Sequence, residues 1–91
     1  MKKLNRHKLF IKDSRKFKLT DQQTTKLFIY IASLLKGEQL SKEAKDHKLN
    51  GEWSDFREFH IGGDVLVIYS LDEKYINLAR LGTHAQLFKK M

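Results

Sequence analysis

Between residues 20 and 37, apolar side chains recur at the spacing of one helix face. They follow at helical intervals, as Leu27, Phe28, Ile31, Leu34 and Leu35. Thr20 with Gln23 three residues later has the pattern of a capping box, and Gly37 provides a stop. The pattern predicts a helix over 20–37 that packs on an apolar partner.

A second, shorter apolar face precedes this helix. Phe10, Ser14 and Phe17 share it among alternating charges, which predicts a helix from about Lys8 to Lys18. A short strand is expected before it, near residues 3 to 6. The two helices would form a helical hairpin.

After Trp53 the spacing of apolar residues changes to that of β-strands. Three segments have this character: 56–61, 65–71 and 75–81. Gly62-Gly63 and residues 72–74 would close two tight hairpins, and the polar residues 38–52 would form a connection. The sequence therefore predicts an α+β fold, with two N-terminal helices packed on a small antiparallel sheet of about four strands.

Length and composition narrow the class of protein. A chain of 91 residues has room for one core, so residues 1–91 should form a single domain. The absence of cysteine excludes thiol enzymes, disulfides and cysteine-ligated metal sites. No apolar run is long enough for a membrane span, and the charged start lacks the apolar stretch of a signal peptide. A cytoplasmic location is expected.

The net charge of +7 comes from the start of the chain. Eight basic residues stand there against Asp13 alone: Lys2, Lys3, Arg6, Lys8, Lys12, Arg15, Lys16 and Lys18. Acidic and basic residues balance from residue 19 onward. The basic segment is therefore a candidate binding surface for RNA or the ribosome, with a merely solvated helix face as the alternative.

The second half of the chain contains residues suited to proton transfer and phosphate binding. Histidine, with an ordinary pKa of about 6.5, can give or take a proton near neutrality. Three histidines, His47, His60 and His84, accompany Asp64 and Arg80 there. An exposed histidine in a polar connection is commonplace, so His47 alone would indicate little. Arg80 interrupts an apolar strand, which requires an edge, a cleft or a partner.

Four ordered motifs resemble the YafQ branch of the RelE/ParE toxin superfamily. They cover nearly the whole chain: DHKLNG (46–51), REFHI (57–61), DVLVIY (64–69) and RLGTHAQLF (80–88). The resemblance implies a bacterial toxin that cuts messenger RNA on the ribosome and is held inactive by an acidic antitoxin.

The resemblance also implies the site residues, which would work without metal or cofactor: His47, His60, Asp64, Arg80, His84 and Phe88. His84 is the candidate general acid, and Phe88 would orient a base or the nearby histidine. The base is left open between His47 and Asp64, with His60 as a competitor. Arg80 would hold the phosphate with its planar fork of donors.

Two departures from the family pattern concern the turn before the third motif. Gly62-Gly63 replaces a charged residue and proline, and Val65 stands where some members have tryptophan. A two-residue loop would place His60 and Asp64 on opposite faces, whereas a three-residue loop would pair them. Asp64 could also be an ordinary turn residue.

Two residues are left outside the predicted site. Arg57 and Glu58 are interpreted as an internal ion pair. His7 matches no motif, and is expected to bind phosphate loosely or to have no role.

Two other functions compete with the nuclease. The first is gyrase inhibition, as in the ParE side of the superfamily, although inhibition by binding needs no acid/base residues. The second is a non-catalytic RNA-binding or ribosome-binding regulator, for which the basic segment suffices. The expected partners are an acidic antitoxin, the ribosome and messenger RNA, with no membrane.

Overall fold

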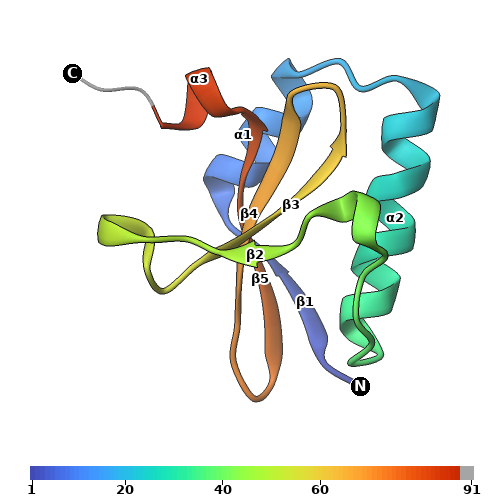
Figure 1. Cartoon of the computed structure of the whole chain (residues 1–91), viewed down its shortest axis with the longest axis vertical. Helices are drawn as coiled ribbons and strands as arrows, with labels where there is room; N and C mark the ends of the chain where they lie inside the picture. The colour runs from blue at the N-terminus through green and yellow to red at the C-terminus, as the bar shows by residue number, and fades with distance from the viewer. Residues whose placement is uncertain (89–91) are drawn as a thin grey trace.

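The computed structural model describes residues 1–88 (Figure 1). Its elements follow in the order β1 (Lys3–Arg6), α1 (Lys8–Lys16), α2 (Asp21–Leu35), η1 (Lys42–Ala44), β2 (His47–Lys48), η2 (Gly51–Trp53), β3 (Arg57–Gly62), β4 (Val65–Leu71), β5 (Tyr75–Thr83) and α3 (His84–Leu87). The predicted helices and strands are present, and the capping box of Thr20 and Gln23 begins α2. Within residues 1–88, no helix combines the length and apolar character needed to cross a bilayer.

The sheet has five strands in the order β1-β5-β4-β3-β2. Strands β3 to β5 pair antiparallel, as predicted. Strand β2 lies within the segment expected to be a connection and pairs antiparallel with β3, and β1 adds a parallel strand beside β5. The α+β class with two N-terminal helices is confirmed, and the sheet is mixed rather than wholly antiparallel. The reason is that β1 and β5 are joined by most of the chain, so no local turn signal indicates their pairing.

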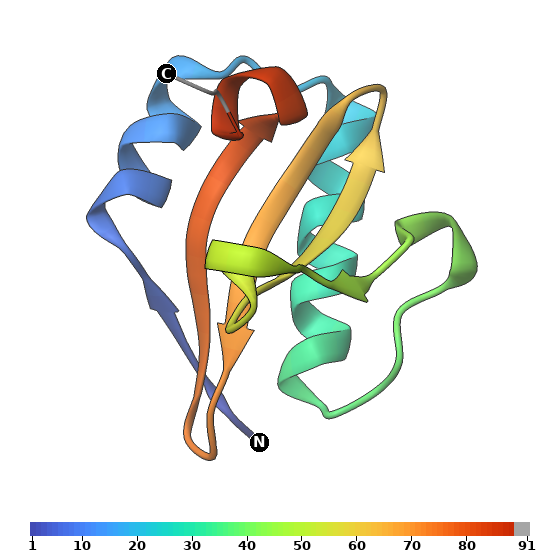
Figure 2. The same ribbon diagram turned by 60° about the vertical axis from the view of Figure 1, so that its left-hand side comes forward.

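The helices lie over the sheet more than against each other. The main contacts of α1 are with β5 and those of α2 are with β3 (Figures 1 and 2). The two helices expected to form a helical hairpin therefore pack mainly on different strands of the sheet. Helix residues Phe10, Leu27 and Ile31 share one core with strand residues such as Phe59 and Val67. This core fixes one face of the sheet.

Strand β4 separates that core from a second, smaller one. Alternate residues of a strand point to opposite faces, so Val65 and Val67 join the helices, whereas Leu66 and Ile68 form a small cluster with Leu87. Partly buried residues complete this cluster: Leu49, Trp53, Phe56, Ala79 and Phe88. The second face therefore combines an apolar floor with the polar residues described next.

Candidate active site

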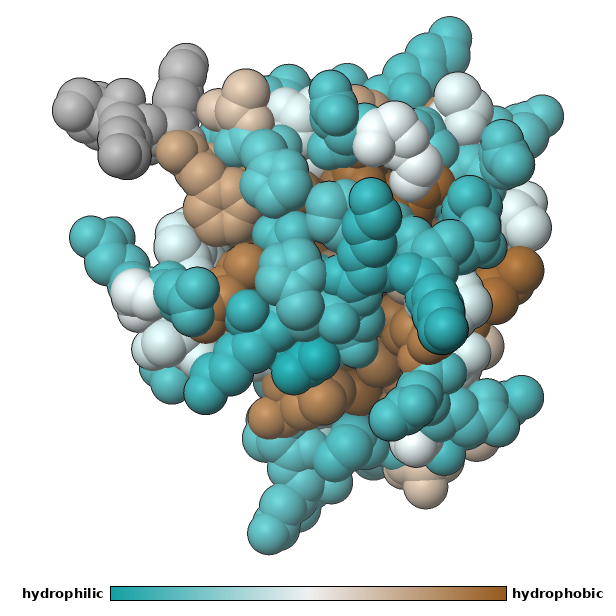
Figure 3. All heavy atoms as spheres, in the orientation of Figure 1, coloured by the Kyte–Doolittle hydropathy of each residue, from teal (hydrophilic) through white to brown (hydrophobic). Residues whose placement is uncertain are grey.

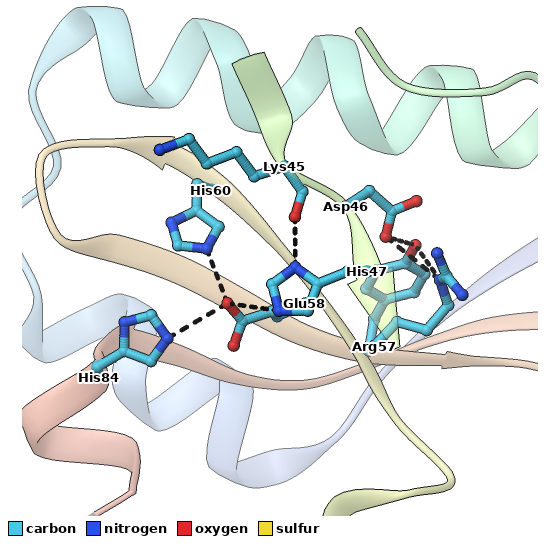
Figure 4. Close-up of polar contacts among 8 residues, drawn as sticks. Lys45, Asp46, His47, Arg57, Glu58, His60 and His84 are labelled. Carbon is cyan, nitrogen blue, oxygen red and sulfur yellow. Dashed lines mark hydrogen bonds and ion pairs between the residues drawn. The ribbon is translucent and has the colours of Figure 1, made fainter. Parts of the chain in front are cut away.

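Three histidine side chains converge on the carboxylate of Glu58 (Figure 4). The Nε2 atoms of His60, His84 and His47 lie 2.7, 3.2 and 3.4 Å from one oxygen, Glu58 Oε2. Glu58 is 1% exposed, and within residues 1–88 its Oε1 has no hydrogen-bond partner. A buried carboxylate requires facing donors or cations, which the imidazoles can supply. We call these four residues the histidine cluster.

The sheet gathers the cluster from three parts of the sequence. His47 of β2 lies opposite Glu58 of β3 in the antiparallel register. His60 lies two residues further along β3 and so on the same face as Glu58. His84 is the first residue of α3, directly after β5. The structure thus brings together all three histidines that the sequence singled out.

Helix α3 holds His84 through a second capping box. The Thr83 hydroxyl accepts from the Gln86 backbone N–H (3.2 Å), and the Gln86 side chain accepts from the Thr83 N–H (3.0 Å). Gly82 leaves room for this capping box, because a Cβ there would lie 2.9 Å from Gln86 Oε1 and 3.3 Å from a methyl of Leu87. The start of α3, and with it His84, therefore has a fixed position.

Two of the histidines are accessible. The His47 and His84 side chains are 53% and 55% exposed, whereas His60 is 20% exposed. Nδ1 of His47 lies 2.6 Å from the Lys45 carbonyl, which can only accept, so this nitrogen donates. In the neutral ring, Nε2 of His47 then carries the lone pair and can take a proton. His47 and His84 are the pair that a substrate can reach.

The expected ion pair between Arg57 and Glu58 is wrong. Adjacent strand residues point to opposite faces, and Arg57 Nε donates instead to Asp46 (3.3 Å) and the Tyr69 hydroxyl (3.4 Å). Burial and a 2.6 Å hydrogen bond to Asp46 raise the pKa of Tyr69. Sequence reasoning therefore missed Glu58, although its place two residues before His60 put both on one face.

Arg80 lies in the same row of the sheet, but its guanidinium is bound to α1. The register places Ile68 between Glu58 and Arg80. Arg80 Nε and Nη2 donate to the two oxygens of Asp13 at 2.8 and 3.1 Å, and the Leu81 N–H donates to Asp13 at 3.0 Å. The hydrogen bonds from Arg80 to Asp13 raise the pKa of Arg80. Arg80 is therefore a fixed cation two strands from Glu58, and not a member of the histidine cluster.

We expect Asp13→Asn to lower the free energy of unfolding near neutral pH by about 1.5–3 kcal/mol, the usual contribution of hydrogen bonds to a charged group. Burial raises the pKa of Asp13, but the donors from Arg80 and Leu81 outweigh it and leave the pKa below 3.8. The stabilisation is therefore complete above that value and is lost as the pH falls through the folded pKa.

Urea unfolding of both proteins, near neutrality and in acid well below 3.8, tests this expectation. The difference between wild type and variant should shrink in acid. An equal difference under both conditions would show that the charge of Asp13 does not stabilise the fold.

Asp64 lies at the exposed tip of the turn between β3 and β4. The register slips between His60 and Gly62, and Gly62 and Gly63 have positive φ angles of 120° and 57°. The turn is thus distorted, but within residues 1–88 the polar contacts of the histidine cluster do not include Asp64. Val65 is 4% exposed and belongs to the helix-side core, so it offers no stacking surface.

The histidine cluster opens on a cavity of about 270 Å³, whose walls are His47, Leu49, Asn50, Trp53, Glu58, His84 and Phe88. The Phe88 ring lies 5.5 Å from that of His84, and the Trp53 ring lies 5.4 Å from that of Phe88. Phe88 is therefore in place to orient His84, and that role stays a prediction. We call this space the histidine cavity.

The predicted RNA-binding cations lie along β1, α1 and the link to α2. Lys2 is partly buried and donates to the Asp72 carbonyl, whereas the side chains of the other seven are exposed: Lys3, Arg6, Lys8, Lys12, Arg15, Lys16 and Lys18. Lys16 and Arg80 line a cavity of about 200 Å³ beside α1. Cations thus continue from Arg80 onto α1.

Part of the histidine cluster also has the geometry of a metal site. His47, Glu58 and His60 offer three ligand atoms within 4.8 Å of one another. Imidazole nitrogen with carboxylate oxygen suits Zn²⁺ and Cu²⁺. These residues therefore fit such an ion, which would occupy nitrogens that acid/base chemistry needs free.

Comparison with known proteins gives consistent matches. The family described as "Bacterial toxin of type II toxin-antitoxin system, YafQ" matches residues 2–89. The mRNA interferase toxin YafQ of Escherichia coli K12 is 41% identical over 61 residues, which span 65% of this chain and 66% of that protein. The matched segment is thus slightly under two thirds of that relative's length.

Solved structures match over almost the full chain. A copper-bound L66S mutant toxin from Helicobacter pylori is 40% identical with a TM-score of 0.88, covering 97% of this chain and 100% of that one. YafQ in the E. coli DinJ-YafQ complex is 29% identical with a TM-score of 0.83, covering 97% and 99%. By sequence and by fold, the chain belongs to the YafQ family of bacterial toxins of type II toxin-antitoxin systems.

Proposed function

We propose that this chain is an mRNA interferase, an endoribonuclease that cuts messenger RNA on the ribosome and so inhibits translation. The observation that carries the proposal is the convergence of three histidines on buried Glu58 at the wall of an open cavity. Cleavage of RNA through its own 2′-hydroxyl requires a base, an acid and a cation near the phosphate. The histidine cluster and Arg80 can provide these groups.

In the proposed reaction His47 is the base and His84 the acid. Nε2 of His47 takes the proton of the 2′-hydroxyl, and the 2′-oxygen attacks phosphorus. The bond from phosphorus to the 5′-oxygen breaks, and His84 gives that oxygen a proton. The products are a 2′,3′-cyclic phosphate and a 5′-hydroxyl. Glu58 is a positioning residue, which holds both rings and faces the cation that forms on His47.

Three other residues have less direct roles in this proposal. His60 is 2.7 Å from Glu58 and more buried, which suits fixing the carboxylate rather than meeting RNA. Arg80 supplies positive charge near the phosphate, and Asp13 orients it. Asp64 is the weaker candidate for the base, because within residues 1–88 it forms no hydrogen bond or ion pair with the histidine cluster.

The partner proposed to inactivate this chain is an acidic antitoxin. E. coli YafQ forms a toxin-antitoxin complex with DinJ. An acidic segment on exposed residues of α1 would meet Lys12, Arg15 and Lys16, so charge complementarity would favour the complex and block RNA. Ribosomal RNA and messenger RNA would use the same cations.

Mapping of messenger breaks on translating ribosomes tests the proposal. Purified protein should produce codon-registered cuts that end in 2′,3′-cyclic phosphate or 3′-phosphate, and no such cuts without ribosomes. Intact messenger together with arrested growth would refute the nuclease and favour gyrase inhibition. Slowed ribosomes on intact messenger would instead favour a non-catalytic binder.

We expect Cu²⁺ or Zn²⁺ to inhibit cleavage by binding His47, Glu58 and His60. The ion would occupy the proposed base, so the single-turnover rate should fall by about 10²–10⁴-fold, the range for loss of acid/base catalysis. Isothermal titration would measure binding, and a chelator should restore the rate. His60→Gln should weaken binding of the metal. A rate that increases with added metal would contradict proton transfer by free imidazoles.

A further inference from the structure

A second cavity, of about 410 Å³, lies next to the histidine cavity. Its walls are mainly apolar, with polar groups among them, and comprise Asn5, His7, Leu9, Trp53, Phe56, Asn77, Leu78, Ala79 and Arg80. Small-molecule sites have this size and this mixture of apolar wall and few polar groups. We call it the tryptophan cavity.

Trp53 belongs to the walls of both cavities. Its ring centroid lies 5.6 Å from that of Phe56 on one side and 5.4 Å from that of Phe88 on the other, and Phe88 is followed by His84 at 5.5 Å. A continuous line of rings therefore leads from the proposed general acid into the tryptophan cavity. In Figure 3, hydrophobic atoms reach the surface beside the places that η2 and α3 occupy in Figure 1.

The polar groups of the tryptophan cavity suit the edge of a nucleobase. Asn5 Nδ2 donates to Asn77 Oδ1 at 2.9 Å, and Asn77 Nδ2 donates to Asp72 Oδ2 at 3.1 Å. Together these bonds use only part of the hydrogen-bonding capacity of the two amides. His7 is fixed because its Nδ1 accepts from the Leu9 N–H at 3.1 Å, which caps α1. Aromatic faces with amides and cations are the groups by which proteins bind unstacked RNA bases.

We propose that the tryptophan cavity binds the base of a nucleotide next to the cleaved bond, stacked on Trp53. The inference rests on the proposed function, because the adjacent cavity is where the phosphate would react. A nucleobase is favoured over an antitoxin side chain, because the tryptophan cavity shares Trp53 with the cavity of the proposed reaction and its aromatic faces and amides match a base. Stacking here would select and position RNA without proton transfer.

The single tryptophan of the chain makes the test direct. Trp53 fluorescence is titrated with a 2′-O-methyl oligoadenylate, which cannot be cut, and with an abasic oligomer of the same length and charge. Quenching by the first and not by the second is expected. With binding followed by the fluorescence anisotropy of an end-labelled oligoadenylate, Trp53→Ala should weaken binding by about 5- to 150-fold, the usual contribution of one stacked base. Trp53→Phe should retain most of the affinity.

The salt dependence of the affinity for RNA distinguishes loss of stacking from loss of a charge contact or of the fold. Trp53→Ala should leave the slope of log affinity against log salt unchanged, because Trp53 neutralises no phosphate. Arg15→Ala should reduce that slope by about one if Arg15 contacts a phosphate. Phe28→Ala is the matched aromatic control, since Phe28 is 66% exposed on α2 and lines neither cavity. Its affinity for RNA should not change.

Equal quenching by the oligoadenylate and the abasic oligomer, or quenching only by antitoxin, would overturn the proposal. If the wild-type protein cuts messenger but binds the oligoadenylate and the abasic oligomer equally, base binding in the tryptophan cavity is refuted and the nuclease is not. Base-dependent quenching without any cleavage would refute the nuclease and uphold base binding at Trp53.

Discussion

Replacing His84 by alanine should lower the single-turnover rate of messenger cleavage on ribosomes by about 10²–10⁴-fold, the usual contribution of a general acid. The side chain is 55% exposed, so the free energy of unfolding should change little. The loss should come from the chemical step, because His84 would protonate the departing 5′-oxygen. Ribosome binding should therefore be retained.

A modified substrate can test the acid role specifically. A 5′-thio leaving group departs without protonation, so the defect of His84→Ala should largely disappear on a messenger that carries sulfur at the cut. Phe28→Ala is the control, since Phe28 is 66% exposed on α2 and lines neither cavity. A full rate for His84→Ala on the ordinary messenger would eliminate His84 as the acid.

Glu58→Gln should reduce the cleavage rate by about 10–100-fold, as loss of a residue that orients ligands or catalytic groups commonly does. Glutamine has nearly the same shape but lacks the charge that faces His47, His60 and His84. NMR of the imidazole nitrogens should show altered tautomers in the variant. Unchanged imidazole signals with a full rate would show that Glu58 is merely buried.

A companion variant separates stability from activity at the same position. Glu58→Leu should match or exceed the thermal stability of the wild type, because Glu58 is 1% exposed beside Ile68 and its Oε1 has no partner within residues 1–88. Cleavage should nevertheless be lost. A strongly destabilised Glu58→Leu protein would show that the carboxylate holds the sheet together.

The parts of the fold with local signals could be predicted from the sequence. The capping box of Thr20 and Gln23, the strand periods and the turn residues act over a few positions, and they gave α2 and the β3–β4–β5 hairpins. The pairing of β1 with β5 could not be predicted, because it joins residues more than 70 positions apart, such as Asn5 and Asn77. Contacts between such distant residues produce no periodic pattern in the sequence.

In the candidate site too, local sequence signals could be recognised and contacts between distant residues could not. The histidines were found through the motifs, and the structure places them together. Glu58 was missed because adjacency in sequence suggested a pair with Arg57, whereas strand geometry puts such neighbours on opposite faces. The partner of Arg80, Asp13, is 67 residues away and lies on a helix, so only the folded chain reveals it.

The two edges of the sheet bear on how separate molecules of this chain would behave in solution. One edge is β1, whose four residues are all exposed and include Lys3 and Arg6. The other is β2, which has only two residues. Short or cationic edge strands are poor templates for pairing with another chain. The fold therefore resists edge-to-edge aggregation, and separate molecules would stay dispersed instead of inactivating one another as deposits.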